Sequence, residues 1–191
     1  MPDTFAMTDT SIIELVMPRA KGKLAELYSV HLTNAMFPAK ITGVLREAAF
    51  LAQIAHESGE LHHVREIWGP NKWQEKYEGH KGLGNVLEGD GKLYLGRGLI
   101  QITGRFNYQK CSRALFNDLR LLDNPELLEE PEYAALSATW YWNERKINAP
   151  ADIGDFQGVT KRINPGLLGH NLRTSYYKIA IAALKLKESI H

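Results

Sequence analysis

The sequence has little that would support disulfide chemistry or binding to a charged polymer through overall charge. It contains one cysteine in 191 residues, so no disulfide can form within the chain. Cys111 continues an apolar spacing with Tyr108 and Leu115, which predicts a buried structural thiol rather than a nucleophile. Lys and Arg total 23 against 22 Asp and Glu, so no broad electrostatic field attracts nucleic acid or an anionic membrane. We therefore expect no nucleic-acid partner.

Long hydrophobic runs and a recognisable secretion signal are also missing from the sequence. No window approaches the length that a helix needs to cross a bilayer. Residues 1–5 include no basic segment leading into a long apolar stretch, which is the usual start of a signal peptide. We expect no signal peptide, no stable membrane insertion, and a protein that stays where it is made until something else releases it.

Metal and cofactor motifs are incomplete. His56 and Glu57, followed by His62 and His63, resemble a zinc motif, but their spacing is wrong. In His-Glu-x-x-His the two histidines are four residues apart on one helical face, whereas position 60 here is Glu60. The glycine-rich run later in the chain lacks the Gly-Lys-Ser/Thr ending of a phosphate loop and the third glycine of a dinucleotide fingerprint. We therefore expect neither a metal nor a cofactor.

The length and composition fit one globular domain with a sizeable core. Hydrophobic residues make up 44% of the chain and charged residues 24%. The sequence has no internal repeat, low-complexity tract or linker that would mark a boundary. We expect a single domain over residues 1–191 and a monomer.

Apolar residues recur mostly at spacings of three and four, which predicts a mainly α fold. The apolar face of residues 44–57 is rich in alanine, so this helix is expected to be central and closely packed. Ser11 and Glu14 form a possible capping box for the first helix. Helices are expected over residues 11–17, 24–35, 44–57, 105–116, 131–145, 152–163 and 172–187.

The periodicity fails between Gly59 and Gly98, where glycines punctuate a long irregular segment. A loop of that length inside a compact domain is usually functional or disordered, and its aromatic residues favour a binding lobe. At most a small β-hairpin is expected here. The segment supplies three candidates for stacking on sugars, Trp68, Trp73 and Tyr77, whereas Trp140 and Trp142 lie on a helical stretch and are expected in the core.

Two glutamates, Glu57 and Glu66, are the candidate catalytic pair. Two separated carboxylates facing a polar cleft are the minimal equipment for cutting a glycosidic bond. Glu57 ends the central apolar helix, where burial against apolar groups would favour the protonated form that a general acid needs. Glu66 follows the turn at Gly59 and is the first candidate for the base that activates water. Other acids of the irregular segment compete for this second role: Glu60, Glu75, Glu78, Glu88 and Asp90.

Taken together, these motifs resemble family 19 chitinases and the related phage and prophage endolysins. The resemblance covers roughly residues 48–177. It rests on His56-Glu57-Ser58-Gly59, on Glu66, on the run from Tyr94 through Gly96-Arg97-Gly98 to Thr103, on Asn107-Tyr108, and on Ile163-Asn164-Pro165-Gly166. Pro165 departs from the family pattern, which has glycine there. The resemblance implies a lysozyme-like or chitinase-like fold.

The resemblance also assigns roles to residues. Glu57 matches the general acid, Glu66 matches the general base that bacterial members place nine residues later, and Thr103 matches the hydroxyl residue that helps to hold the attacking water. For the sugar site, the matched positions and the aromatic candidate together give seven expected substrate-binding residues: Gln101, Asn107, Tyr94, Arg97, Asn164, Arg173 and Trp68. Among these, the arginine at 173 is also expected to pair with the acidic centre.

The implied activity is single-displacement hydrolysis, with inversion, of β-1,4 bonds in the glycan strands of bacterial peptidoglycan. Such an endolysin is expected in the host cytoplasm until a holin opens the membrane, when it reaches the cell wall. Its single catalytic domain over residues 1–191 is expected to act without a separate cell-wall-binding domain. Two alternatives remain open at this point. One is a chitinase acting on polymers of β-1,4-linked N-acetylglucosamine, and the other is a non-catalytic saccharide-binding protein.

Overall fold

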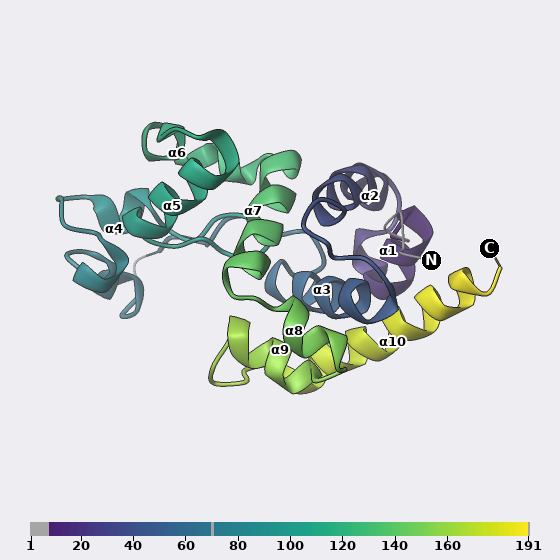
Figure 1. Cartoon of the computed structure of the whole chain (residues 1–191). Helices are drawn as coiled ribbons and strands as arrows, with labels where there is room; N and C mark the ends of the chain where they lie inside the picture. Colours follow the sequence, from purple (N-terminus) through teal and green to yellow (C-terminus); the bar gives the residue numbers. More distant parts are fainter. Residues whose placement is uncertain (1–7, 70, 191) are drawn as a thin grey trace.

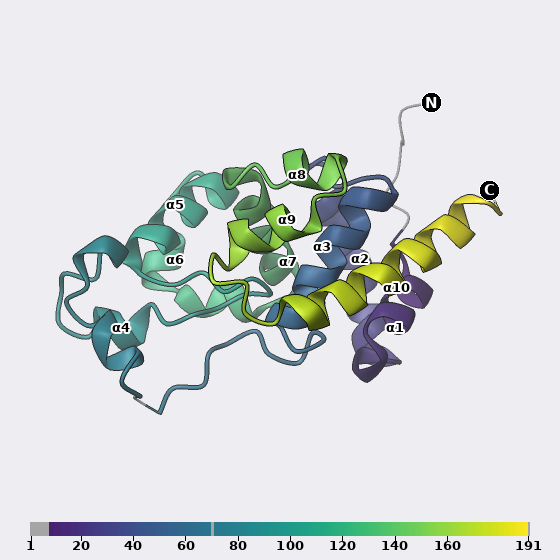
Figure 2. The ribbon, with the colours of Figure 1, turned by 90° about the horizontal axis from the view of Figure 1, so that it is seen from below.

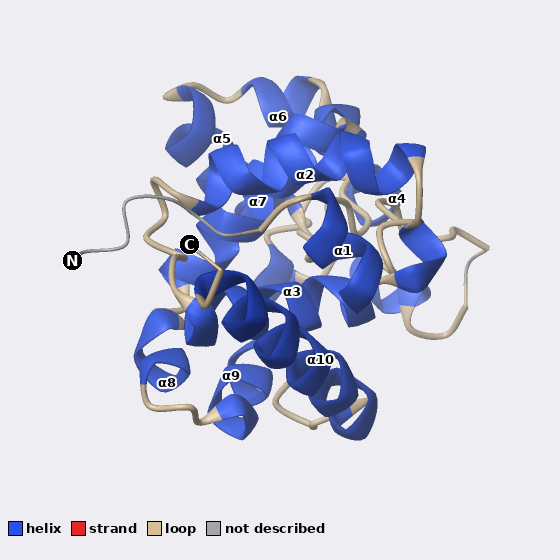
Figure 3. Cartoon of the chain, turned by 90° about the vertical axis from the view of Figure 1, so that its right-hand side faces the viewer, coloured by secondary structure: helices blue, strands red, loops and turns tan. Residues whose placement is uncertain are grey.

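The computed structural model describes residues 8–69 and 71–190, and within these ranges the fold is helical with no named strand (Figures 1 and 3). The predicted mainly α class is confirmed. Four short 3-10 helices, Pro18–Ala20, Gln74–Tyr77, Lys81–Leu83 and Pro125–Glu129, connect the α-helices. The α-helices are α1 (Thr10–Val16), α2 (Lys23–Met36), α3 (Val44–Glu57), α4 (Asp90–Leu93), α5 (Arg105–Phe116), α6 (Arg120–Asp123), α7 (Pro131–Glu144), α8 (Asn148–Asp152), α9 (Phe156–Ile163) and α10 (His170–Glu188).

The helices form two lobes that share α7 (Figure 1). The large lobe contains α1, α2, α3 and α8–α10, and the small lobe contains α4–α6 with the irregular segment before them. Each lobe has its own apolar core. The alanines of α7 and Trp142 pack into the large core, whereas Tyr133 and Trp140 of the same helix pack against the small core. Helix α7 therefore fixes the position of one lobe relative to the other.

Helix α3 is the central element of the large lobe. Its residues from Glu47 to Ala55 are all buried, and α10 runs along it (Figure 2). The alanines at this contact have small side chains, which lets the two helices approach closely. The helix ends at Ser58, whose hydroxyl donates to the Ile54 carbonyl and accepts from the Leu61 backbone N–H. This turn carries Glu57 out of the core at the helix terminus.

Two helix predictions were wrong in detail. The cap of α1 is Asp9, which accepts from the Ile12 N–H, while Glu14 binds the Gly22 N–H instead of closing a capping box. The helix expected over residues 152–163 is broken between α8 and α9. Gly154 adopts a left-handed backbone conformation there, and the side chain of the next residue caps α9 by accepting from a backbone N–H.

The irregular segment is held to the small lobe by two isolated antiparallel β-bridges. Arg97 is the common member, and it pairs with Arg65 on one side and Ile102 on the other. Two isolated bridges are less β-structure than the small β-hairpin expected at most from the sequence. Cys111 is fully buried in the small core, which confirms the structural reading of the thiol, and burial raises its pKa. No helix within residues 8–69 and 71–190 is long and apolar enough to cross a membrane.

Asp90 ties the start of α4 to α5. Its carboxylate, 2% exposed, pairs with the Arg105 guanidinium at 2.6 Å and accepts from the Val86 and Leu87 N–H groups. The hydrogen bond from Arg105 is the largest cause that holds the pKa of Asp90 below its ordinary value of 3.8. Folding depresses the pKa of Asp90. The stabilisation from its ion pair is therefore fully present above the pKa that Asp90 has in the unfolded chain, and it is lost as the pH falls through the lower pKa of the folded protein.

We predict that Asp90→Asn lowers the free energy of unfolding at pH 7 by roughly 1.5–3 kcal/mol, the range for hydrogen bonds to charged groups. The difference from the wild type should shrink below about pH 4, where the wild-type carboxylate also becomes protonated. Urea unfolding at pH 7 and pH 3 measures both effects. Asp118→Asn, which breaks an exposed pair with Arg120, is the control. Equal losses in the two variants would contradict a special role for the Asp90 pair.

Candidate active site

Glu57 is held by a buried arginine from the last helix. The Arg173 Nη2 atom lies 2.5 Å from Glu57 Oε1, and the Glu57 side chain is 23% exposed. Arg173 also donates to Gln53 Oε1 on α3 at 2.5 Å and to the Leu168 carbonyl at 3.2 Å. The expectation of apolar surroundings for Glu57 was therefore incomplete. Its nearest charged neighbour is a guanidinium whose other hydrogen bonds fix it in place.

His56 lies next to this ion pair and backs onto the loop between α9 and α10. Burial, followed by the nearby charge of Arg173, lowers its pKa, and the Glu57 carboxylate opposes this effect. Within the described residues its Nδ1 atom is buried without a hydrogen-bond partner. A Cβ atom at Gly169 would lie only 2.2 Å from His56 Cε1. Only glycine therefore fits at this point of the loop, which packs directly on the ring.

Glu66 lies on the irregular segment and is held by three donors of the small lobe. Its Oε1 atom accepts from Gln74 Nε2 at 3.0 Å and from the Tyr77 hydroxyl at 3.4 Å. Its Oε2 atom accepts from the Gly96 N–H at 3.1 Å, and its own N–H donates to the Gly96 carbonyl. Burial and the charge of Glu66 raise the pKa of Tyr77, so the phenol remains a proton donor. This set of donors fixes a carboxylate that is only partly buried.

Three of the competing acids are engaged by the protein itself. Glu60 accepts from the Tyr176 hydroxyl at 2.9 Å and is 5% exposed. Asp90 pairs with Arg105, and Glu78 holds two backbone N–H groups of the loop leading into α4. Glu66 is also held by the protein, but by neutral donors, and its side chain is only half-buried, so it remains the first candidate for the base. The two other competitors, Glu75 and Glu88, have exposed side chains.

A cavity of ≈ 170 Å³ brings together three of the expected sugar-site and water-site residues. Gln101, Thr103 and Asn107 line it from the motif that precedes and begins α5. Asn107 Nδ2 donates to the backbone carbonyl of Thr103 at 2.7 Å, which fixes the Asn107 side chain relative to the backbone that carries Thr103. Neither candidate glutamate lines this cavity. Tyr141 of α7 does, and burial raises its pKa, opposed by the charge of Arg145 and assisted by that of Glu57.

Three expected substrate-binding residues are corrected by their burial. Tyr94 is 1% exposed, and its hydroxyl donates to the Leu122 carbonyl inside the small lobe. Arg97 is 2% exposed and forms an ion pair with Glu129 at 2.7 Å. Arg173 is 1% exposed and pairs with Glu57, which confirms the expected pairing but leaves it no surface for a sugar. A side chain without accessible surface cannot touch a polymer, so these three shape the site from behind it.

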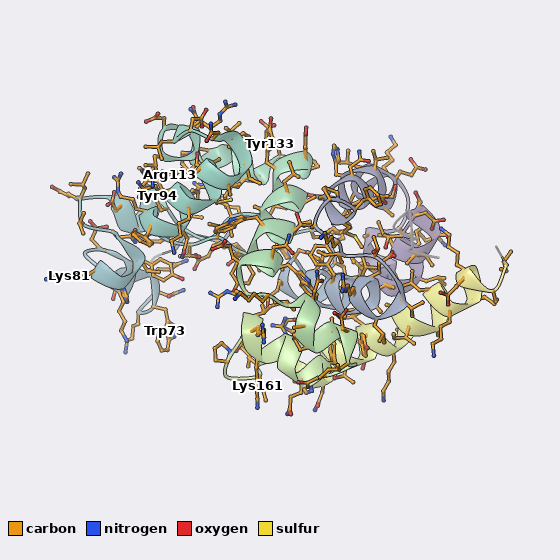
Figure 4. The ribbon with its side chains drawn as sticks, viewed as in Figure 1. Trp73, Lys81, Tyr94, Arg113, Tyr133 and Lys161 are labelled. Atoms are coloured by element: carbon orange, nitrogen blue, oxygen red, sulfur yellow. The ribbon has the colours of Figure 1, made fainter. Side chains whose placement is uncertain are left out.

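Trp68 and Asn164 stay predictions as sugar-binding residues. Trp68 is half-buried, with its ring centroid 6.5 Å from that of Tyr77. Asn164 follows α9, and its side-chain oxygen accepts from the Gly166 N–H at 3.1 Å across the exposed Pro165. Trp73 is 73% exposed and lies on the lower edge of the small lobe (Figure 4). None of the three lines the cavity of Gln101, Thr103 and Asn107.

Sequence reasoning missed several residues of the site. Gln74 is 1% exposed and orients Glu66, yet it lies in a polar stretch without periodicity. Trp140 was expected in the core but is half-buried and lines the cavity. Tyr141 beside it shows that α7 faces the site, a feature that the helical spacing alone does not reveal. Within the described residues no three metal-ligating side chains gather.

Comparison with known proteins agrees with this arrangement. A family model for class I chitinases of glycoside hydrolase family 19 matches residues 39–165. A Haemophilus influenzae protein with a glycosyl hydrolase family 19 domain is 29% identical over 188 residues, covering 76% of this chain and 91% of that protein. Endochitinase 1 of Theobroma cacao is 37% identical over 103 residues, covering 50% of this chain but only 32% of the plant protein. The chain thus aligns with about a third of the cacao enzyme.

Solved structures show the same fold. Chitinase C from Streptomyces griseus HUT6037 superposes with a TM-score of 0.69 at 25% identity, covering 91% of this chain and 92% of that one. A bacterial family 19 chitinase gives 0.71 at 23% identity, covering 93% and 94%. The match of the family model over most of the chain, together with the shared fold, means that the protein belongs to glycoside hydrolase family 19, the class I chitinase family.

Proposed function

We propose that this protein hydrolyses β-1,4-glycosidic bonds in the glycan strands of bacterial peptidoglycan, with inversion at the anomeric carbon. The observation that carries the proposal is the pair of differently held carboxylates. Glu57 on the large lobe is bound by a buried guanidinium, and Glu66 on the small lobe is bound by neutral donors. Different surroundings give two carboxyl groups different roles in acid–base catalysis.

In the proposed mechanism, Glu57 protonates the glycosidic oxygen while Glu66 takes a proton from water on the opposite face of the sugar. Negative charge then develops on Glu57, where the Arg173 guanidinium stabilises it. Glu66 keeps its orientation through Gln74 and the Gly96 N–H. Thr103 is the proposed partner of the water. An inverting pair requires roughly 6.5–9.5 Å between the carboxyl groups to admit that water.

Peptidoglycan is the proposed polymer, and chitin is the second candidate. Both contain β-1,4-linked N-acetylated sugars, so the same pair of acids serves either substrate. The form of the motif, Gly-Leu-Ile-Gln-Ile-Thr-Gly, and the extension after Glu66 resemble endolysins and support the first choice. Similarity to cacao endochitinase and to Streptomyces chitinase C supports the second.

The proposed cellular role is that of a phage or prophage endolysin acting as a monomer. The protein would collect in the host cytoplasm and reach the wall after a holin opens the membrane. Product analysis separates this proposal from its alternatives. We expect new reducing ends by mass spectrometry after incubation with purified peptidoglycan, at a higher rate than with soluble chitin oligomers. Faster turnover of chitin would reverse the assignment of substrate, and binding without products would identify a saccharide-binding protein.

We predict that Glu57→Gln lowers kcat by at least roughly 10²–10⁴-fold, because an amide cannot deliver the proton. Since Gln also removes the charge that faces the buried Arg173, circular dichroism and a melting curve must accompany the assay. Glu57→Asp provides a second test. It retains the charge opposite Arg173 but withdraws the carboxyl from the glycosidic oxygen, so kcat should fall in a protein with near wild-type stability. Full activity in a folded Glu57→Gln protein would refute the acid assignment.

We predict that Glu66→Gln also lowers kcat by roughly 10²–10⁴-fold, because the amide cannot accept the proton of water. Glu88→Gln is the matched control, since Glu88 is an exposed acid of the same irregular segment. The kcat of the Glu88→Gln protein should equal that of the wild type. Initial rates on reducing-end release measure both variants. If Glu88→Gln is inactive while Glu66→Gln turns over normally, the base is misassigned.

A further inference from the structure

The cavity beside the sugar-site residues has a charged wall that the hydrolytic mechanism does not use. Gln101, Thr103 and Asn107 form one side of it. The other side comes from α5, α7 and the residue that follows α7. Its members are three exposed charged side chains and two half-buried aromatic ones: Lys110, Glu144, Arg145, Trp140 and Tyr141. We call this set the α5–α7 wall.

Aromatic rings position both cations of the α5–α7 wall. The Arg145 guanidinium carbon lies 4.5 Å from the centroid of the Tyr141 ring, and Lys110 Nζ lies 4.9 Å from that of Phe106. Stacking of this kind limits the motion of a long side chain without neutralising its charge. The backbone of Arg145 is fixed as well, because Arg162 of α9 donates to the Arg145 carbonyl at 2.7 Å.

The charge of these two cations is available to a ligand. Over residues 8–69 and 71–190, neither Lys110 nor Arg145 lies within ion-pair distance of a carboxylate, whereas Arg97, Arg105 and Arg173 around the same site are all paired. Glu144 contributes one negative charge to the wall, so two cations against one carboxylate leave one net positive charge. A positive wall of this kind attracts an anionic group on a bound glycan.

The two candidate polymers differ in this respect. Chitin is uncharged, so cations beside its binding groove have no partner on it. In peptidoglycan each muramic acid carries a lactyl ether, which ends in a carboxyl group or is joined to a peptide with free carboxylates. Building on the proposed peptidoglycan hydrolysis, we propose that Lys110 and Arg145 bind a carboxylate of the muramic acid substituent. Bidentate contact with Arg145 is the stronger of the two interactions.

The test is the double variant Lys110→Gln/Arg145→Gln, assayed on three glycans. These are peptidoglycan with intact peptides, the same glycan stripped of peptides by an amidase so that lactyl carboxylates remain, and soluble chitin oligomers. We expect KM to rise roughly tenfold on an anionic glycan, with kcat nearly unchanged, and no change on chitin oligomers. A loss on the stripped glycan alone identifies the lactyl carboxylate, a loss on the intact one alone identifies a peptide carboxylate, and a loss on both shows that the two cations accept either carboxylate. Added salt should reduce the difference in KM between the wild type and the double variant on the anionic glycans, because salt screens the attraction between charges.

Arg113→Gln is the control for loss of a surface cation, because Arg113 is an exposed arginine of α5, which also carries Lys110, and does not line the cavity. It removes one positive charge, against two in the double variant, and should leave KM unaltered on all glycans. Unchanged KM in the double variant on every glycan would overturn the proposal, as would an equal loss on chitin oligomers.

A binding measurement separates this proposal from the proposed hydrolysis. Isothermal titration of a soluble disaccharide–peptide into the Glu57→Gln protein should show roughly tenfold weaker binding when both cations are replaced. If the wild type cleaves chitin but not peptidoglycan while this difference persists, the proposed function fails and the binding site stands. If peptidoglycan is cleaved and the difference is absent, the binding site fails alone.

Discussion

The structure depends on satisfying one buried guanidinium. Arg173 has almost no exposed surface, and removing a charge from water is costly unless hydrogen bonds and an opposite charge compensate it. Gln53, Glu57 and the Leu168 carbonyl provide that compensation from α3 and the loop before α10. Gln53 in turn donates to the Thr160 hydroxyl on α9 at 3.1 Å. The closest packing in the large lobe, between α3 and α10, is thus organised around the same group that holds the acid, so stability and catalysis share one arrangement of side chains.

The division into two lobes explains why the two carboxylates have such different surroundings. Glu57 lies at the end of a helix whose middle residues, 47–55, are buried, and the Arg173 guanidinium of α10 pairs with it there. Glu66 lies on an extended segment whose position is set by bridges through Arg97 and by the donors of the small lobe. Helix α7 packs against both cores, so it determines how the acid side and the base side face one another. Its last turn also forms part of the cavity next to the sugar-site residues.

Local pattern predicted the elements well, and long-range contacts account for most of what it missed. The helices α3 and α5 begin and end as expected, because each follows a glycine, Gly43 or Gly104, and has a regular apolar spacing. Family resemblance proposed the two acids, but a motif does not report accessibility, so Tyr94 and Arg97 were expected at the sugar and lie inside the small lobe. The pairing of Arg173 with Glu57 came from resemblance alone, since residues at opposite ends of a chain leave no local signal. Trp140 was expected in the core but lines the cavity, because helical spacing identifies the apolar face of a helix and not the residues that cover it.

The position of Arg173 in the chain has a consequence for biosynthesis. Glu57 emerges from the ribosome together with the helix that carries it, well before its partner, because Arg173 lies much later in the chain on α10. Domains fold as their chain becomes available, so Glu57 has no guanidinium to orient it until α10 has been made. A truncated translation product that ends before α10 lacks this partner and the packing along α3. The order of the sequence thereby makes assembly of the candidate active site depend on synthesis of α10.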